Sequence, residues 1–153
     1  MIASTHLAAG VFSGLFIQRY LPENSGVIEK IGAGFCAGFV SHLILDAIPH
    51  KDYDVSGYVL GGVLSVEILA VLCLVFYPAR SAIMNWIILF GMAGAAFPDL
   101  FSLGYQYGFK WRWLYDVGQF FHVFHGKSDA VYKMNILSQI FLIILFLLGS
   151  WRK

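Results

Sequence analysis

Apolar residues follow this chain in long runs that short polar or turn-forming segments interrupt. Five such runs cover about 6–20, 31–48, 58–77, 82–97 and 130–151. A helix needs roughly 20 apolar residues to cross a hydrocarbon core of about 30 Å, and each run reaches or approaches that length. The intervening segments carry proline, glycine and charged residues, which end helices. The pattern therefore predicts an all-α transmembrane helical bundle of about five spans.

A sixth apolar segment, 114–126, is too short to span a bilayer, and we expect a short interfacial or re-entrant helix there. The aromatic residues before it suit the headgroup level of a membrane; they are Tyr105, Tyr107, Trp111 and Trp113. The fourth run is expected to stop at Pro98-Asp99. Small residues in the second run, among them Gly34 and Gly38, predict that a neighbouring helix approaches closely.

Composition supports a membrane protein of one domain. Of the 153 residues, 59% are hydrophobic and 12% are charged, which lies outside the usual range of water-soluble proteins. We expect a single membrane-embedded domain over 1–153, in a multi-pass protein of the prokaryotic cytoplasmic membrane. The first twenty residues lack the pattern of a removed signal peptide, because Arg19 follows the apolar stretch. The net charge of +1, without a basic run, gives no reason to expect a nucleic-acid partner. Cys36 and Cys73 are expected to be small buried hydrophobes.

The polar chemistry is concentrated in four short motifs, and all five histidines lie in or beside them. The motifs are Thr5-His6, His42-x3-Asp46-x3-His50, Pro98-Asp99 and His122-x2-His125. Imidazole and carboxylate groups are costly in an apolar setting unless a partner such as a metal ion compensates them. Threading five spans alternately through a bilayer brings all four motifs to the same membrane face. The sequence therefore predicts one shared metal site.

The spacing of these residues suits metal ligation. At 100° per residue, His42, Asp46 and His50 fall at 0°, 40° and 80° of a helical wheel, so they form one stripe. His122 and His125 also share a helix face. Nitrogen and oxygen ligands favour zinc, with manganese or iron as alternatives, and one to three ions are expected. An open position would hold a water whose pKa falls to about 7. The predicted ligands are His6, His42, Asp46, His50, Asp99, His122 and His125.

Two acids and four cations receive further roles in this hypothesis. Asp46 and Glu67 are the candidate catalytic residues; Glu67 is alternatively a partner that orients a ligand, or a hydrogen-bonded structural acid. In the predicted topology four cations share the face of the metal site and are expected to hold a substrate phosphate. They are Lys51, Lys110, Arg112 and Lys127.

At these motifs the chain resembles the membrane-bound metal-dependent hydrolases, a bacterial and archaeal family whose motifs are similar to those of zinc-dependent phospholipase C. The matching residues are Thr5-His6-x3-Gly10, Ser41-His42-x2-Leu45-Asp46-x2-Pro49-His50, Pro98-Asp99 and His122-x2-His125-x2-Ser128. The resemblance implies metal-dependent hydrolysis of a phosphoester, in a lipid headgroup or a lipid phosphate, so a membrane lipid is the expected partner. The chain departs from the family pattern in lacking the second acid of Pro-Asp-x-Asp.

Three other interpretations use the same residues. A non-enzymatic membrane carrier or channel for metal ions or protons also needs intramembrane histidines and acids. Haem ligation by two histidines leaves the aspartates unexplained. A purely structural role would use the histidines for hydrogen bonds between helices. Polar residues are sparse in the halves of the spans far from the motifs, which favours a closed pocket over a path across the membrane.

Overall fold

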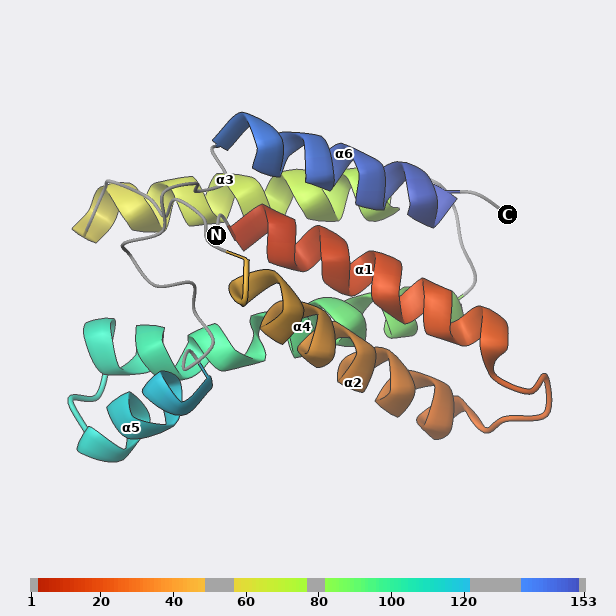
Figure 1. The fold of residues 1–153 in the computed structure, drawn as a ribbon, viewed down its shortest axis with the longest axis horizontal. Coiled ribbons are helices and arrows are strands. Elements are labelled where there is room, and N and C mark those ends of the chain that lie inside the picture. Colours follow the sequence, from red (N-terminus) through yellow and green to blue (C-terminus); the bar gives the residue numbers. More distant parts are fainter. Residues whose placement is uncertain (1–2, 49–56, 77–81, 122–135, 152–153) are drawn as a thin grey trace.

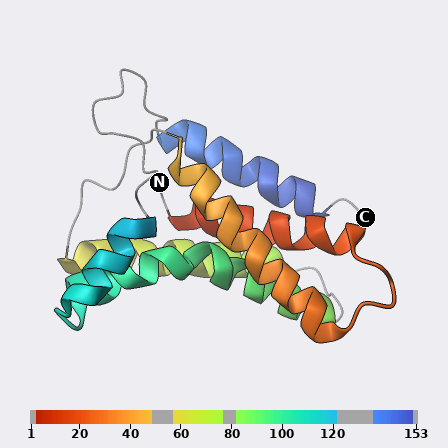
Figure 2. The ribbon, with the colours of Figure 1, turned by 60° about the horizontal axis from the view of Figure 1, so that its bottom comes forward.

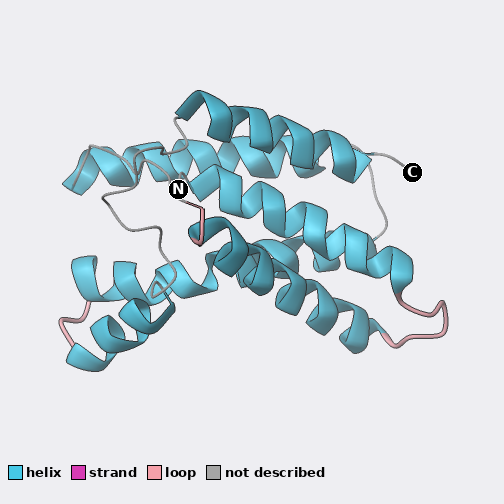
Figure 3. Cartoon of the chain, viewed as in Figure 1, coloured by secondary structure: helices cyan, strands magenta, loops and turns pink. Residues whose placement is uncertain are grey.

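The computed structural model describes residues 3–48, 57–76, 82–121 and 136–151. Within these ranges the chain forms six helices and no strand (Figure 1, Figure 3). The helices are α1 (Ala3–Tyr20), α2 (Val27–Asp46), α3 (Gly57–Phe76), α4 (Ala82–Tyr107), α5 (Arg112–Phe121) and α6 (Ile136–Trp151). The prediction of an all-α fold is confirmed.

Helix α1 is the centre of the bundle. It packs against α2, α4, α6 and α3, while α5 packs against α4. In the view of Figure 1, α3 and α6 lie above α1 and α2 lies below it; Figure 2 shows α2 crossing in front of α1, and in both views α5 folds back along the end of α4. The start of α3 and the hairpin of α4 and α5 both project beyond the start of α1, at the same end of the bundle (Figure 1).

The expectation of five membrane spans is supported in part. Among the described residues, two helical segments are long and apolar enough to cross a membrane, Val27–Asp46 and Ala82–Gln106. Gly57–Cys73 and Ser138–Gly149 are apolar but shorter. Fewer than half of the residues in the apolar window of each long segment are buried inside the bundle.

The predicted end of the fourth span at Pro98 is wrong, because α4 runs through Pro98 to Tyr107. Within a helix, proline removes one backbone hydrogen bond, here the one to the carbonyl of Gly94. Packing of α5 stabilises the continuation: Gly118 lies so close to Ser102 that a Cβ there would overlap the hydroxyl oxygen. The continuation therefore depends on a tertiary contact that the local sequence pattern does not contain.

The predicted short helix before the last span exists as α5, although it begins two residues earlier than expected. The expectation for the cysteines is wrong, because both Cys36 and Cys73 are exposed. They lie on faces of α2 and α3 that no other described helix covers.

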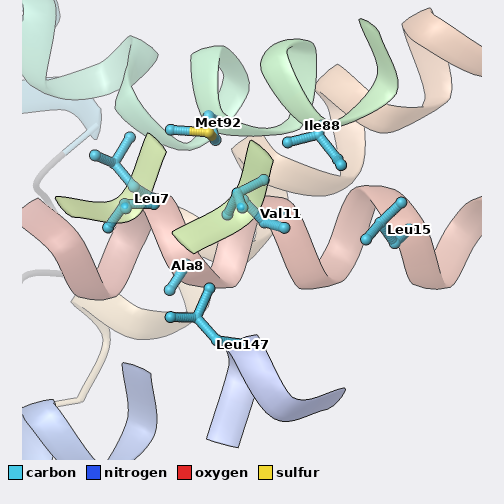
Figure 4. Packing of buried hydrophobic residues seen from close by; sticks show 9 residues of the cluster. Leu7, Ala8, Val11, Leu15, Ile88, Met92 and Leu147 are labelled. Carbon is cyan, nitrogen blue, oxygen red and sulfur yellow. The ribbon is translucent and has the colours of Figure 1, made fainter. Parts of the chain in front are cut away.

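The apolar core lies between α1, α3, α4 and α6. Figure 4 shows how α1 places Val11 beside Ile88 and Met92 of α4, with Leu147 of α6 below Ala8. The other members of this buried cluster are Leu7, Leu15, Val71 and Val75. This core fixes the position of α1, which carries the first predicted ligand.

Glycines bring α1 and α2 into backbone contact with α4. A Cβ added at Gly10 or at Gly38 would overlap the carbonyl oxygen of Gly91. A Cβ at Gly94 would likewise overlap the carbonyl oxygen of Phe35. Such close approach is typical of helices that pack through small residues spaced four apart. The predicted role of the small residues in the second span is thereby confirmed, and α4 is the neighbouring helix.

The glycine contacts also fix the directions of the three helices. Gly14 of α1 and Gly34 of α2 both face Ile87, one turn before Gly91 in α4. Residues later in α2 contact residues later in α4, so these two helices run parallel. Residues later in α1 contact residues earlier in α4, so these two helices run antiparallel. As a result, the start of α1, the end of α2 and the turn of α4 that follows Gly91 meet at one place.

Candidate metal centre

The faces of α1 and α2 that carry the closely packed glycines also carry the candidate ligands. His6 lies four residues before Gly10, and His42 lies four residues after Gly38. Residues four apart occupy the same face of a helix. The close contact of the three helices therefore directs both imidazoles into the interior at the next turn, and Asp46 follows His42 on the same face.

The three side chains converge at one point. One ligand atom from each of His6, His42 and Asp46 lies within 4.8 Å of the others. Asp46 lies between the two rings: its Oδ1 is 3.3 Å from His6 Nε2, and its Oδ2 is 3.1 Å from His42 Nε2. The rings stack with their centroids 4.3 Å apart. All three residues are almost fully buried, with exposed fractions of 3%, 0% and 1%.

A backbone contact fixes the orientation and tautomer of His42. Its Nδ1 lies 2.6 Å from the carbonyl oxygen of Ala95 in α4. Since a carbonyl oxygen only accepts hydrogen bonds, Nδ1 carries a proton and donates it. The neutral ring then has its lone pair on Nε2, the nitrogen that faces Asp46. A ring nitrogen beside a carboxylate oxygen can share a proton or a metal ion with it, and histidine ligands of metals are commonly held by a backbone carbonyl in this way.

Two further buried polar atoms belong to the same turn of α1. Within the described part of the chain, His6 Nδ1 and Thr5 Oγ1 make no hydrogen bond, although both atoms are buried. Burying a polar atom without a partner costs free energy. The start of α1 thus carries two buried polar atoms that have no hydrogen-bond partner among the described residues.

The donor set fits a divalent metal ion. Zinc takes nitrogen and oxygen ligands at 2.0–2.2 Å in a tetrahedral arrangement, so two ligands of one ion lie about 3.4 Å apart. The ligand atoms of the group lie within 4.8 Å of one another, so its widest pair has to approach by up to about 1.4 Å around such an ion. Two imidazoles and a carboxylate also suit manganese or iron. The buried group can therefore hold a metal ion, and its chemistry alone does not select one metal.

Asp99 lies at the open side of this group. Its Oδ1 is 3.9 Å from His42 Nε2, and its side chain is 37% exposed. Asp99 follows Ala95 by one turn of α4, so both residues face α2. The structure thus places the predicted ligand Asp99 next to the buried group, with its side chain partly exposed.

Glu67 contacts the start of α1 at its backbone. Its Oε2 accepts a hydrogen bond from the backbone N–H of Ser4, at 3.1 Å. The first N–H groups of a helix have no partner within the helix, and the helix dipole favours a negative charge there. Since Ser4 is two residues before His6, Glu67 stabilises the end of the helix that carries this candidate ligand. The contact favours a structural or orienting role for Glu67 over that of a general base.

The predicted phosphate ligands Lys110 and Arg112 are not brought to the cluster. Lys110 Nζ donates to the carbonyl oxygen of Gln106 at 2.7 Å and lies over the ring of Tyr105. Because α4 continues past Asp99 to Tyr107, both cations are separated from the cluster by at least about 12 Å of helix. Five other predicted site residues lie outside the described residues: His50, Lys51, His122, His125 and Lys127.

Sequence reasoning missed the carbonyl of Ala95, which orients His42. It also missed the buried hydroxyl of Thr5, which it treated only as part of a motif. Every residue has a backbone carbonyl, so the residue types do not indicate which carbonyl binds His42. The spacing of four residues between glycine and histidine was available as a signal, since it marks the packed face in both α1 and α2.

Comparisons with known proteins give no relative for this chain: no family model, no curated protein and no solved structure matches it. The functional argument therefore rests on the residues and geometry of the site.

Proposed function

We propose that this protein is a membrane-embedded, metal-dependent hydrolase that cleaves a phosphoester in a lipid headgroup or a lipid phosphate. The observation that carries the proposal is the orientation of His42, whose Nδ1–H is bonded to Ala95 while Nε2 faces Asp46 beside His6. A divalent ion bound there supplies an activated water and polarises a phosphoryl oxygen. Zinc is the first ion that we propose, because the motifs of the chain resemble those of a zinc-dependent family, and manganese and iron are the alternatives that the same ligands suit.

The surface of the bundle supports a membrane location. Large apolar side chains are exposed along α2, α3, α4 and α6, whereas water-soluble monomers rarely expose extended apolar surface. Examples are Ile28, Ile44, Val66, Leu69, Leu89, Phe141 and Leu148. At 1.5 Å per residue, the 20 residues of α3 are about 30 Å long and the 18 of α1 about 27 Å. We propose that α1, α2, α3, α4 and α6 all cross the membrane.

Each residue of the site has a distinct role in this proposal. His6 and His42 present ring nitrogens as ligands, because a metal ion binds the neutral form of imidazole and their rings stack 4.3 Å apart beside Asp46. Asp46 presents one oxygen to each imidazole and balances the charge of the ion. Asp99 is partly exposed at the open side, so its Oδ1 is placed to accept the proton of an attacking water.

The distribution of buried polar residues favours a closed pocket over a carrier or channel. The buried polar residues in the described part of the chain are Ser4, Thr5, His6, His42, Asp46 and Gln139. They lie at the start of α1, the end of α2 and the start of α6, and the starts of α1 and α6 share one end of the bundle (Figure 1). Farther along, the buried positions are apolar, as Leu15 and Ile87 are. An ion or proton path needs polar groups across the whole membrane.

Headgroup release from phospholipids and phosphate release from polyprenyl phosphates test the proposal directly. The reconstituted protein is stripped with a chelator and reloaded with zinc, manganese or iron, and His42→Ala is compared with Ser65→Ala. Ser65 is an exposed residue whose hydroxyl donates a hydrogen bond to the carbonyl oxygen of Gly61 in its own helix, so it provides a matched control. We expect activity to depend on metal and on His42. Metal binding without hydrolysis of any of these phosphoesters would reject the hydrolase and leave the carrier, which a metal-flux assay in vesicles then tests.

A further inference from the structure

The connection between α4 and α5 presents a row of exposed aromatic rings. In Phe109-Lys110-Trp111-Arg112-Trp113, aromatic and cationic residues alternate. The ring of Trp111 stacks on Phe109 with centroids 4.8 Å apart, and on Trp113 with centroids 6.1 Å apart. The three residues are 63%, 54% and 52% exposed, in the order Phe109, Trp111, Trp113. We call 109–113 the aromatic tip.

The aromatic tip differs from the other exposed apolar surface of the protein. Much of the other exposed apolar surface lies along α2 and α4, which are long and apolar enough to cross a membrane. At the aromatic tip, Lys110 and Arg112 interrupt the aromatic row, and the chain is not helical at Phe109–Trp111. Asp116, one turn after Arg112, is the acid on the adjoining part of α5. A segment with aromatic rings, two cations and one nearby acid suits the boundary between acyl chains and anionic headgroups.

The length of α4 beyond Asp99 sets how far the aromatic tip lies from the buried group of His6, His42 and Asp46. From Asp99 to Tyr107, eight residues of α4 extend about 12 Å beyond the cluster. From Glu67, which contacts the start of α1, ten residues of α3 extend about 15 Å back to Gly57. Both helices project at the same end of the bundle, as Figure 1 shows. The end of α4 and the start of α3 thus extend by similar lengths beyond the buried group, at the same end of the bundle.

We propose that the aromatic tip binds the headgroup layer of a bilayer that contains anionic lipids. Phe109, Trp111 and Trp113 insert at the level of the glycerol backbone. Lys110 and Arg112 lie close to lipid phosphates, where they contribute charge attraction rather than catalysis. This inference rests on the membrane location in the proposed function, but it does not depend on metal binding or hydrolysis. The partner is a lipid surface.

Depth-dependent fluorescence quenching of the full chain tests this binding. Trp86, Trp113 and Trp151 are replaced by phenylalanine, so that Trp111 is the single fluorophore. The protein is reconstituted into vesicles of phosphatidylcholine with or without phosphatidylglycerol, carrying nitroxide labels either at the headgroup or deep in the acyl chain. A reference variant places the single tryptophan within the apolar, membrane-crossing part of α4 by Phe90→Trp, with Trp111 also replaced. Phe90 is exposed and lies eight residues, about 12 Å, from the start of α4.

We expect the headgroup label to quench Trp111 more strongly than the deep label, and the opposite order for the Phe90→Trp reference. Lys110→Gln combined with Arg112→Gln should reduce quenching of Trp111 in vesicles with phosphatidylglycerol, and not in phosphatidylcholine alone. If the labels quench the Phe90→Trp reference but not Trp111, the aromatic tip does not bind the headgroup layer, although the protein still lies in the membrane. A reference that neither label quenches would overturn the membrane location itself. Equal quenching of Trp111 with and without the two cations would overturn the role of anionic lipids. Circular dichroism confirms that each variant keeps its helices.

Discussion

His42 Nδ1 donates a hydrogen bond to the carbonyl oxygen of Ala95 across 2.6 Å, which joins α2 to α4 beside the buried group of His6, His42 and Asp46. The bond fixes the imidazole ring and leaves Nε2 as the nitrogen that faces Asp46. Backbone carbonyls commonly orient histidine ligands in this way. The position of α2 relative to α4 therefore determines whether the ligands meet.

Gly38→Ala tests that dependence without removing a ligand. A Cβ at Gly38 would overlap the backbone of Gly91, so α2 and α4 have to separate. Overpacking of this kind costs about 1–3 kcal/mol. We expect a lower melting temperature and weaker metal binding, measured by thermal unfolding and by metal titration.

Gly32→Ala is the matched control in the same helix, because no atom lies within 4 Å of a Cβ added there. It should leave metal affinity unchanged and should not lower the melting temperature. Normal metal binding by Gly38→Ala would show that the glycine contact does not position the ligands.

Two substitutions of Glu67 distinguish a positioning role of its carboxylate from a catalytic one. Glu67→Ala removes the acceptor for the Ser4 N–H, and loss of such a cap costs about 0.5–2 kcal/mol. Glu67→Gln keeps an acceptor oxygen but removes the charge. We expect the alanine variant to bind metal more weakly, and the glutamine variant to recover most of that affinity and to retain hydrolysis. Abolished hydrolysis in Glu67→Gln, with normal metal binding, would instead identify Glu67 as the general base.

Asp99→Asn distinguishes proton transfer from metal ligation. The buried group of His6, His42 and Asp46 remains intact in this variant, whereas the partly exposed carboxylate is lost. We expect metal affinity to fall by less than about tenfold, the lower limit for losing a supporting group, while hydrolysis falls much further. Equal losses of affinity and activity, measured by metal titration and headgroup release, would make Asp99 a ligand rather than a proton acceptor.

Periodicity in the sequence was sufficient to predict the helices and part of the site. A stripe at 100° per residue placed His42 and Asp46 on one face of α2, and the structure confirms that they share that face. Alternate threading of the spans brought His6 and Asp99 to the same end as this stripe, and the structure places both beside it. These features depend on local spacing and on the order of the helices.

Other features depend on tertiary contacts that residue types do not encode. The passage of α4 through Pro98 relies on α5 packing near Ser102, and it carries Lys110 away from the cluster. The carbonyl of Ala95 became a hydrogen-bond acceptor for His42 only through the approach of two helices at their glycines. Cys36 is apolar enough for a core, but no helix among the described residues covers its face of α2, and it is exposed.

Elemental analysis of the purified protein tests the central claim most directly. The wild type, a His42→Ala/Asp46→Ala double variant and the Ser65→Ala control are purified in detergent without any chelator. The structure predicts a stoichiometric divalent metal in the wild type and in Ser65→Ala, and its loss from the double variant, since that variant removes two of the three buried ligands. No metal in the wild type, and none retained after zinc, manganese or iron is added back, would contradict the claim that this cluster is a metal centre.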